Sequence, residues 1–186
     1  GAIEVNSIEE MGEITMTLLR LKPSQGKRAA VLVAGGGSSV ATGDICADEG
    51  IELPALSENT RQGLLEFISL VNQGVANPID VPSVVMDISS LQRTYELLAA
   101  DPQIDIIMLH LGAEFFAGPM VGAMGELHKR ISGSAQEKHS IKPVVVALSE
   151  EGQVHDTEKY AQQLREAGVT VYNSLRKACR ALNRFV

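Results

Sequence analysis

Apolar residues along the chain follow two patterns, continuous short runs and runs with helical spacing. Continuous runs over 28–34, 104–110 and 143–147 predict strands that are buried on both faces, as in a parallel sheet covered by helices. Two shorter runs, at 51–53 and 169–172, predict short strands. Elsewhere apolar residues recur every three or four positions, which predicts an N-terminal helix from residue 8 and further helices over 39–49, 58–72, 89–100, 119–131, 156–167 and 174–184.

Polar residues mark where several of these helices begin. Ser7 and Glu10 have the spacing of a capping box, in which the serine accepts a backbone hydrogen bond and the glutamate reaches back. Ser57 is the expected cap of the helix over 58–72. Asp87 and Ser89 compete as caps of the helix over 89–100.

Strands that alternate with helices predict an α/β fold. Five strands, the second and the last of them short, predict a flavodoxin-like, doubly wound parallel sheet of order 2-1-3-4-5 with helices on both faces. The second strand is expected at 51–53, because 74–82 is too rich in proline for a central strand. Residues 1–25 are expected to form a helical extension that packs on a domain formed by 26–186.

Composition excludes several classes of function. The net charge of −7 and the scattered basic residues argue against a nucleic-acid partner, although the last helix is modestly basic. No apolar run reaches the roughly 18 residues that a membrane span needs, and we see no signal peptide. Cys46 and Cys179 are the only cysteines, without C-x-x-C spacing, so we expect reduced, buried thiols in a cytoplasmic protein and no metal site.

The strongest candidate for chemistry is the glycine-rich turn that follows the first buried strand. Gly35, Gly36 and Gly37 would let backbone N–H groups approach an anion, and Ser38 and Ser39 could add hydroxyl donors at a helix N-terminus. The G-x-G-x-x-G fingerprint and the Gly-Lys-Ser/Thr motif are both absent, which argues against a dinucleotide site and a P-loop. From the residues alone, an anion site and a tight turn that needs small residues are equally good interpretations.

Other candidates lie in two further loops. His110 ends the strand over 104–110 and, with Glu114, offers a candidate base or phosphate partner, although a half-buried structural histidine is the alternative. Asn77 and Asp80 flank a proline and are expected to order their own loop. The remaining histidines are expected to be solvated: His128, His139 and His155. No intact catalytic set appears in the sequence.

Three segments in order resemble the carboxy-terminal flavodoxin-like ligase domain of NDP-forming acyl-CoA synthetases. They are GKRAAVLVAGGG at 26–37 with Asp44, GIELPALSENT at 50–60, and ANPID at 76–80. The chain is similar, more distantly, to the carboxy-terminal domain of the succinyl-CoA synthetase β subunit. The opening residues 3–10 also resemble the helix that precedes this domain in the family.

The resemblance implies a shared phosphate site. These enzymes interconvert acyl-CoA, ADP and phosphate with free acid, ATP and CoA through a phosphohistidine that belongs to a neighbouring domain. ATP with Mg²⁺ binds an ATP-grasp domain and CoA binds a Rossmann-type domain. The present chain would then present a helix N-terminus to the phosphoryl group through Gly35–Ser39, with Asn77, Asp80 and Gly112 structuring the site, and it would not be active alone.

The sequence departs from the family pattern in two loops. The β subunit has paired glycines after the third strand, whereas this chain has a single glycine, Gly112, followed by Glu114, whose charge would repel phosphate. The first loop reads GGGSS where the synthetases more often have GGPG. Two alternatives therefore stay open: a non-catalytic binding or assembly domain that kept the fold, and an independent small-molecule enzyme that uses His110 and Glu114.

Overall fold

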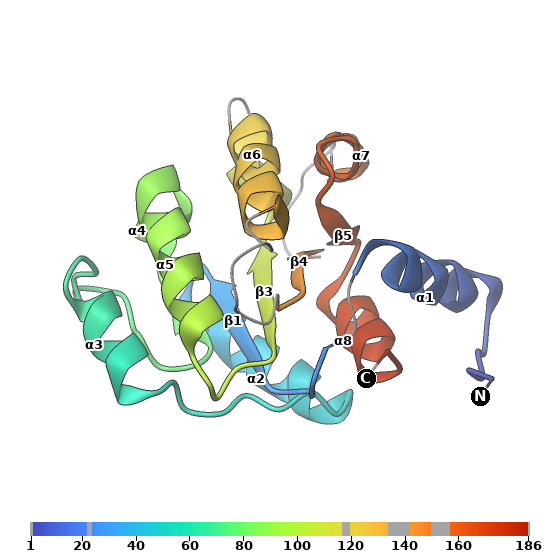
Figure 1. Ribbon diagram of the computed structural model, residues 1–186, viewed down its shortest axis with the longest axis horizontal. Helices are drawn as coiled ribbons and strands as arrows, with labels where there is room; N and C mark the ends of the chain where they lie inside the picture. Colours follow the sequence, from blue (N-terminus) through green and yellow to red (C-terminus); the bar gives the residue numbers. More distant parts are fainter. Residues whose placement is uncertain (1, 22–23, 117–119, 134–141, 150–156, 186) are drawn as a thin grey trace.

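A computed structural model describes residues 2–21, 24–116, 120–133, 142–149 and 157–185. Its centre is a five-stranded, all-parallel sheet of order β2-β1-β3-β4-β5, which confirms the predicted flavodoxin-like α/β fold (Figure 1). Three strands, β1, β3 and β4, are buried along their whole length, as their continuous apolar runs predict. The strands are β1 (Ala29–Val33), β2 (Ile79–Asp80), β3 (Ile106–Leu111), β4 (Val144–Leu148) and β5 (Thr170–Tyr172).

The identity of the second strand differs from the prediction. Ile79 and Asp80 pair with Leu32 and Val33 of β1, whereas Glu52 makes only an isolated bridge to Arg28. Prolines exclude a segment from the middle of a sheet because they cannot donate to the ladder, but they tolerate an edge position, which β2 occupies. The prolines of 74–82 therefore keep this segment out of the centre of the sheet but not off its edge.

The helices follow the predicted order, with differences at two helix ends and one additional short helix before α5. The first turn of α2 begins at Gly36 rather than at residue 39, so two of the three glycines are helical. The third helix, α3, ends at Leu65 rather than at residue 72, and Asn72 beyond it has a φ of 55°. A short helix that was not predicted, α4, precedes α5. The helical elements are α1 (Ile8–Arg20), α2 (Gly36–Asp48), α3 (Glu58–Leu65), α4 (Pro82–Val85), α5 (Ile88–Ala100), the 3-10 helix η1 (Ala113–Phe116), α6 (Met120–Gly133), α7 (Thr157–Glu166) and α8 (Leu175–Asn183).

The predicted caps are present at three helices. Ser7 accepts from the Glu10 N–H, and Ser57 accepts from the Thr60 N–H. Of the two candidates for α5, Asp87 is the cap, because its carboxylate accepts from the Ser90 N–H at 2.8 Å.

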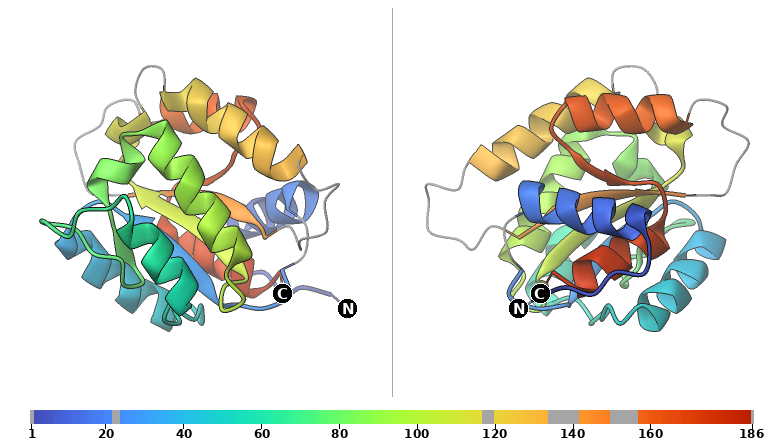
Figure 2. Two further views of the ribbon diagram at one scale, coloured as in Figure 1. Left: turned by 60° about the vertical axis from the view of Figure 1, so that its left-hand side comes forward. Right: turned by 90° about the vertical axis from the view of Figure 1, so that its right-hand side faces the viewer.

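Helices cover the sheet on both faces (Figures 1 and 2). Ala30 and Leu32 of β1 face a core shared with α3, α4, α5, α6 and α7. Ala29, Val31 and Val33 face the opposite core, which contains residues of α1, α2 and α8. Because successive side chains of a strand point to opposite faces, the parity of a residue number decides which core it joins.

The N-terminal helix α1 packs beside α8 and the edge strand β5 (Figure 2). Thr17 and Tyr172 share a buried hydrogen bond of 2.6 Å between their hydroxyl groups. Arg20 donates through Nη1 to the carbonyl oxygens of Arg165 and Val169, at 3.3 and 3.2 Å. In the described part of the chain, no helix is long and apolar enough to cross a membrane.

Candidate functional site

Candidate residues gather at the carboxyl ends of the central strands. The end of β1 leads directly into Gly35 and the first turn of α2. His110 of β3 is in register with Val33 of β1 and Ala147 of β4. It shares the parity of Ile106 and Met108, so its side chain faces α2 and α8. This edge is where open parallel sheets bind ligands.

The glycine turn forms the N-terminus of α2. Gly35 is the N-cap with a φ of 122°, a conformation that favours glycine, and its carbonyl oxygen accepts from the Ser39 N–H at 3.0 Å. Gly36 and Gly37 are exposed to solvent. A Cβ placed on Gly37 would meet nothing within 4 Å. The turn therefore presents accessible backbone donors at the positive end of a 13-residue helix.

Asp80 places a carboxylate beside this turn. Its Oδ1 accepts from the Gly35 N–H at 2.7 Å, and its Oδ2 lies 3.9 Å from where a Cβ on Gly36 would be. The N-terminus of α2 is thus already next to one negative charge of the chain itself. A phosphate at Gly36–Ser39 would bind beside that carboxylate, which weakens the attraction.

Asn77 fixes the loop that carries Asp80. Its Nδ2 donates to the carbonyl oxygens of Ala29 and Pro54, at 2.7 and 3.0 Å, and its Oδ1 accepts from the Val31 N–H at 3.1 Å. The Asn77–Pro78 peptide bond is cis. The asparagine therefore ties its loop to β1 rather than only to itself, and it sets the start of β2 opposite the end of β1.

His110 is 8% exposed, and its ring is held by α2. The Nδ1 atom lies 2.8 Å from Oγ1 of Thr42, which is completely buried. Sequence reasoning missed Thr42, although a signal was present: it lies four residues before the buried Cys46 on the same face of α2. The structure thus brings the histidine against α2.

The remaining candidate residues, Gly112 and Glu114, directly follow β3, and the structure describes their backbone. Gly112 is buried directly after β3, and its carbonyl oxygen accepts from the Phe115 N–H at 3.2 Å. Glu114 belongs to η1, but its side chain is outside what the structure describes, as are residues 117–119. A catalytic pair of His110 and Glu114 therefore stays a prediction.

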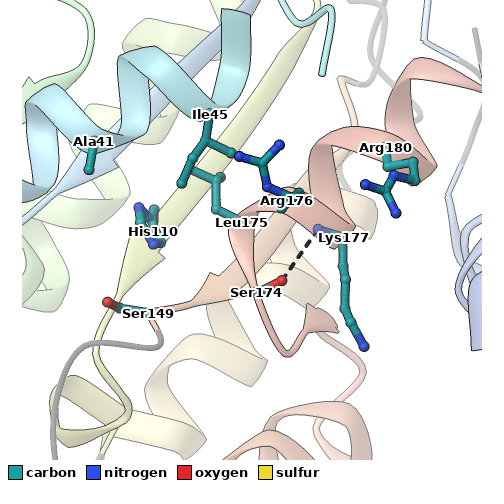
Figure 3. A pocket seen from close by; sticks show the side chains of 9 residues that line it. All are labelled: Ala41, Ile45, His110, Ser149, Ser174, Leu175, Arg176, Lys177 and Arg180. Atoms are coloured by element: carbon teal, nitrogen blue, oxygen red, sulfur yellow. Dashed lines mark hydrogen bonds between the residues drawn. The ribbon is translucent and has the colours of Figure 1, made fainter. Parts of the chain in front are cut away.

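A pocket of about 380 Å³ lies between α2 and α8, with His110 at one end (Figure 3). Ser149, directly after β4, and Ser174, the N-cap of α8, line it from the strand side. The full lining consists of Ala41, Ile45, His110, Ser149, Ser174, Leu175, Arg176, Lys177 and Arg180. This pocket was not foreseen from the sequence.

The basic residues of α8 make ion pairs around this pocket. Arg176 contacts Glu49 at 2.8 Å and Asp48 at 3.3 Å, and Arg180 contacts Glu49 at 3.0 Å. Lys177 pairs with Glu13 of α1 at 3.0 Å. Burial raises the pKa of Glu49, but hydrogen bonds from Arg180 and Arg176 outweigh it, so the pKa lies below its usual value. The charge that made α8 look basic is largely balanced within the fold.

The histidine prediction was wrong for His128. It is half-buried rather than solvated, and its Nδ1 is a buried atom without a hydrogen-bond partner among the described residues. Burial, assisted by the charge of Arg20, lowers the pKa of His128. His139 and His155 lie outside the described residues. Within the described ranges, no three His, Cys, Asp or Glu side chains group as metal ligands would.

Comparison with known proteins gives one family and several similar structures. The family model described as the Ligase-CoA domain matches residues 29–182. The structure of PH0766 from Pyrococcus horikoshii OT3 is similar with a TM-score of 0.75 and 23% identity, over 98% of this chain and 40% of that chain. Two structures of the dinucleotide-forming acetyl-coenzyme A synthetase 1 of Ca. Korarchaeum cryptofilum are similar with a TM-score of 0.74 and 21% identity.

The two Korarchaeum structures are an apo form and a complex with phosphate and ADP. The match covers 97% of the present chain and 37% of theirs, so this chain spans about two fifths of the length of the similar proteins. At these identities the likeness shows a shared fold. No curated protein matches the sequence.

Proposed function

This chain belongs to the Ligase-CoA domain family, and we propose that it is one domain of an NDP-forming acyl-CoA synthetase-like ligase, to which it contributes part of a phosphate site. The complete enzyme converts acyl-CoA, ADP and phosphate into the free acid, ATP and CoA in the cytoplasm. The proposed partners are a domain that carries the phosphorylated histidine, an ATP-grasp domain that binds ATP with Mg²⁺, and a CoA-binding domain.

The single observation that carries the proposal is the exposed N-terminus of α2 at the carboxyl end of β1. Backbone donors and a helix dipole stabilise a phosphoryl group without any side-chain chemistry. Gly36 and Gly37 expose those donors, and Gly35 has no side chain with which to cap them. The greater length of the similar proteins, one of which was solved with phosphate and ADP, supports a role within a larger enzyme.

Phosphate binding at this turn can be tested with a matched pair of variants. A side chain at Gly37 meets open space, so Gly37→Asp and Gly37→Asn should both fold. The aspartate adds a negative charge at the helix start, whereas the asparagine adds the same bulk without charge. In an amide NMR titration with phosphate, we expect saturable shifts at Gly36–Ser39 in the unchanged chain and in Gly37→Asn, and their loss in Gly37→Asp.

The titration also has clear opposing outcomes. Shifts confined to another helix end, or equal shifts in both variants, would show that the phosphate role is assigned to the wrong turn. Chloride at matched ionic strength is the control for general screening. Because the carboxylate of Asp80 accepts from Gly35 nearby, the isolated domain should bind phosphate weakly.

Turnover tests the enzymatic part of the proposal. We expect no acyl-CoA formation from the purified chain with ATP, CoA and an organic acid, since those sites lie on other domains. Activity should appear only when polypeptides that supply the phosphohistidine, ATP-grasp and CoA-binding domains are added. Robust turnover by the chain alone would contradict the proposal. Stable association with those domains without phosphate binding would instead favour an assembly domain.

A further inference from the structure

Three polar residues reach the α2–α8 pocket from successive strands of the sheet. His110, the second-last residue of β3, is in phase with Met108, and Ser149 directly follows β4 in phase with Ala147. Ser174, two residues beyond β5, is the N-cap of α8. All three line the same pocket (Figure 3). The carboxyl ends of three neighbouring strands thus bring a ring nitrogen and two hydroxyl groups to the sheet edge where α/β folds bind ligands.

Part of the pocket lining is apolar. Ala41 and Ile45 of α2 lie one helical turn apart, and Leu175 of α8 lies across from them (Figure 3). The volume of about 380 Å³ falls within the range of small-molecule sites, which combine apolar walls with a few polar groups. The pocket therefore suits a ligand that has an apolar body and a polar head.

Among the described residues, the charged side chains that line the pocket are all cations. Arg176, Lys177 and Arg180 contribute to the lining, whereas their carboxylate partners do not. The pair of Arg176 and Asp48 is exposed on both sides, with side-chain exposures of 47% and 65%, and such a pair contributes little to stability. Exchanging Asp48 for an anionic group of a ligand therefore costs the fold little.

The polar end of the pocket is held in place by the fold. Thr42 fixes the His110 ring through Nδ1 at 2.8 Å, and Ser174 accepts from the Lys177 N–H at 3.4 Å as the cap of α8. A binding group whose orientation is set before binding loses less freedom when the ligand arrives. This arrangement distinguishes the pocket from an incidental surface hollow.

We infer that the α2–α8 pocket is a binding site for a small organic anion, with its charged head toward Arg176, His110 and the two serines and its apolar body against Ala41, Ile45 and Leu175. The head is a carboxylate or a phosphate ester, since the cations and hydroxyl groups can donate hydrogen bonds to either. The inference does not rest on the proposed function, because the pocket shares none of its lining residues with Gly35–Ser39.

Four probes with related structures test the inference by NMR titration of the isotope-labelled chain. Butyrate and butyl phosphate carry both an apolar body and an anionic head, n-butanol lacks the charge, and inorganic phosphate lacks the body. We expect saturable shifts at the Ile45 and Leu175 methyl groups with at least one organic anion, with a Kd of about 1 mM for so small a probe. n-Butanol and inorganic phosphate should bind at least about tenfold more weakly at these methyl groups.

Two variants with matched controls separate pocket binding from surface binding. Ala41→Leu fills the pocket and should abolish the shifts, whereas Val40→Leu at the neighbouring, 69% exposed position should leave them unchanged. Arg176→Gln should weaken binding about threefold to tenfold. Lys129→Gln, which removes a cation from an exposed pair on α6, should have no effect. The charge variants keep the test decisive if Ala41→Leu folds poorly.

Each result of these titrations either supports or overturns the proposed site. Binding of butyrate alone or of butyl phosphate alone supports the site and identifies its head group. The inference is overturned if neither organic anion shifts the two methyl groups, if n-butanol binds as tightly as butyrate, or if inorganic phosphate matches butyl phosphate. It is also overturned if Arg176→Gln and Lys129→Gln weaken binding equally, because the effect would then be general electrostatics.

Discussion

Two buried tyrosines differ in what their hydroxyl groups contact. The Tyr172 hydroxyl bonds Thr17 at 2.6 Å, whereas the Tyr95 hydroxyl is buried without a hydrogen-bond partner among the described residues. Removing a bonded hydroxyl loses a buried hydrogen bond, whereas removing an unpaired one loses none. In chemical denaturation we expect Tyr172→Phe to lower the free energy of unfolding by about 1 kcal/mol and Tyr95→Phe to change it by less than about 0.5 kcal/mol. An equal loss in both variants would show that Tyr95 has a polar partner.

We expect the ion pair of Asp105 and Arg28 to make the fold sensitive to acid. Asp105, whose side chain is 6% exposed, accepts from the Arg28 backbone N–H, Nε and Nη2 at 3.1, 2.8 and 2.7 Å. Hydrogen bonds from Arg28 hold the pKa of Asp105 below its usual value, despite partial burial. A carboxyl with a depressed folded pKa stabilises the fold fully above its unfolded pKa of about 3.9, and this contribution is lost as the pH falls through the folded value.

Denaturation curves at several pH values test this assignment. Asp105→Asn should reduce stability at pH 7 and flatten the loss of stability below about pH 4, because the variant has no carboxyl to protonate. Glu66→Gln, which removes an exposed partner of Arg93, is the control and should leave both quantities nearly unchanged. If Asp105→Asn keeps the full acid sensitivity of the original chain, other carboxyls carry it.

At the residue scale, the sequence predicted where candidate residues lie in the strands and helices better than it predicted what their side chains contact. It singled out His110 at a strand end, but the Thr42 contact depends on how α2 crosses the sheet, which no local pattern states. The solvated position expected for His128 assumed that a polar residue on a helix faces water. Here α6 packs between α5 and α7, which leaves the ring half-buried.

At the scale of elements, helix α1 packs on the rest of the fold through one buried face. Ile14 is 4% exposed in the core shared with α8, whereas Ile8, six residues earlier in the same helix, is 82% exposed. Removing buried methyl groups costs transfer free energy and leaves a cavity. Ile14→Ala should therefore lower the free energy of unfolding by about 2–4 kcal/mol, and Ile8→Ala by less than about 0.5 kcal/mol.

The same pair of variants tests whether α1 is part of the cooperative unit. If Ile14→Ala unfolds in one transition at lower denaturant, α1 and the domain over 26–186 unfold together. A separate early transition that leaves the remaining fold unchanged would make α1 an independent extension. Native-state hydrogen exchange of the α1 amides distinguishes the two results.

At the scale of elements, apolar periodicity predicted most of the strands and helices. Continuous runs identified β1, β3 and β4 because these strands are buried on both faces. The prediction failed for β2, because the prolines of 74–82 were taken to exclude a strand, whereas a two-residue strand at the sheet edge tolerates them. Sheet order still came out correctly, since it depends on the number and sequence of crossovers rather than on the length of each strand.

At the scale of the whole molecule, the reaction rates of two buried thiols report on the stability of the fold. Cys46 of α2 and Cys179 of α8 are both buried, as predicted, and their Sγ atoms lie 3.8 Å apart. The contact with Cys46 and burial raise the pKa of Cys179, so the reactive thiolate is disfavoured. We expect both thiols to react with a disulfide reagent at least about 1000-fold more slowly in the native chain than in denaturant, and at one common rate.

An exposed neighbour provides the reference for this measurement. Ala47 follows Cys46 in α2 and is exposed, so Ala47→Cys should react at once under native conditions. Different native rates for the two natural thiols would mean that α2 and α8 separate locally before the molecule unfolds. Rapid reaction of both would contradict the packing described between these helices.

The side chain of Asn77 has a consequence beyond the loop that it orders. Because β2 has only two residues, most of the outer edge of β1 lacks a neighbouring strand. The Ala29 N–H donates to the carbonyl oxygen of Glu52. The Asn77 side chain donates to the Ala29 carbonyl oxygen and accepts from the Val31 N–H, so one amide group substitutes for a missing strand. An open edge would be a template on which other chains add a strand and aggregate. We therefore expect replacement of this asparagine to expose a strand edge on which other chains could aggregate.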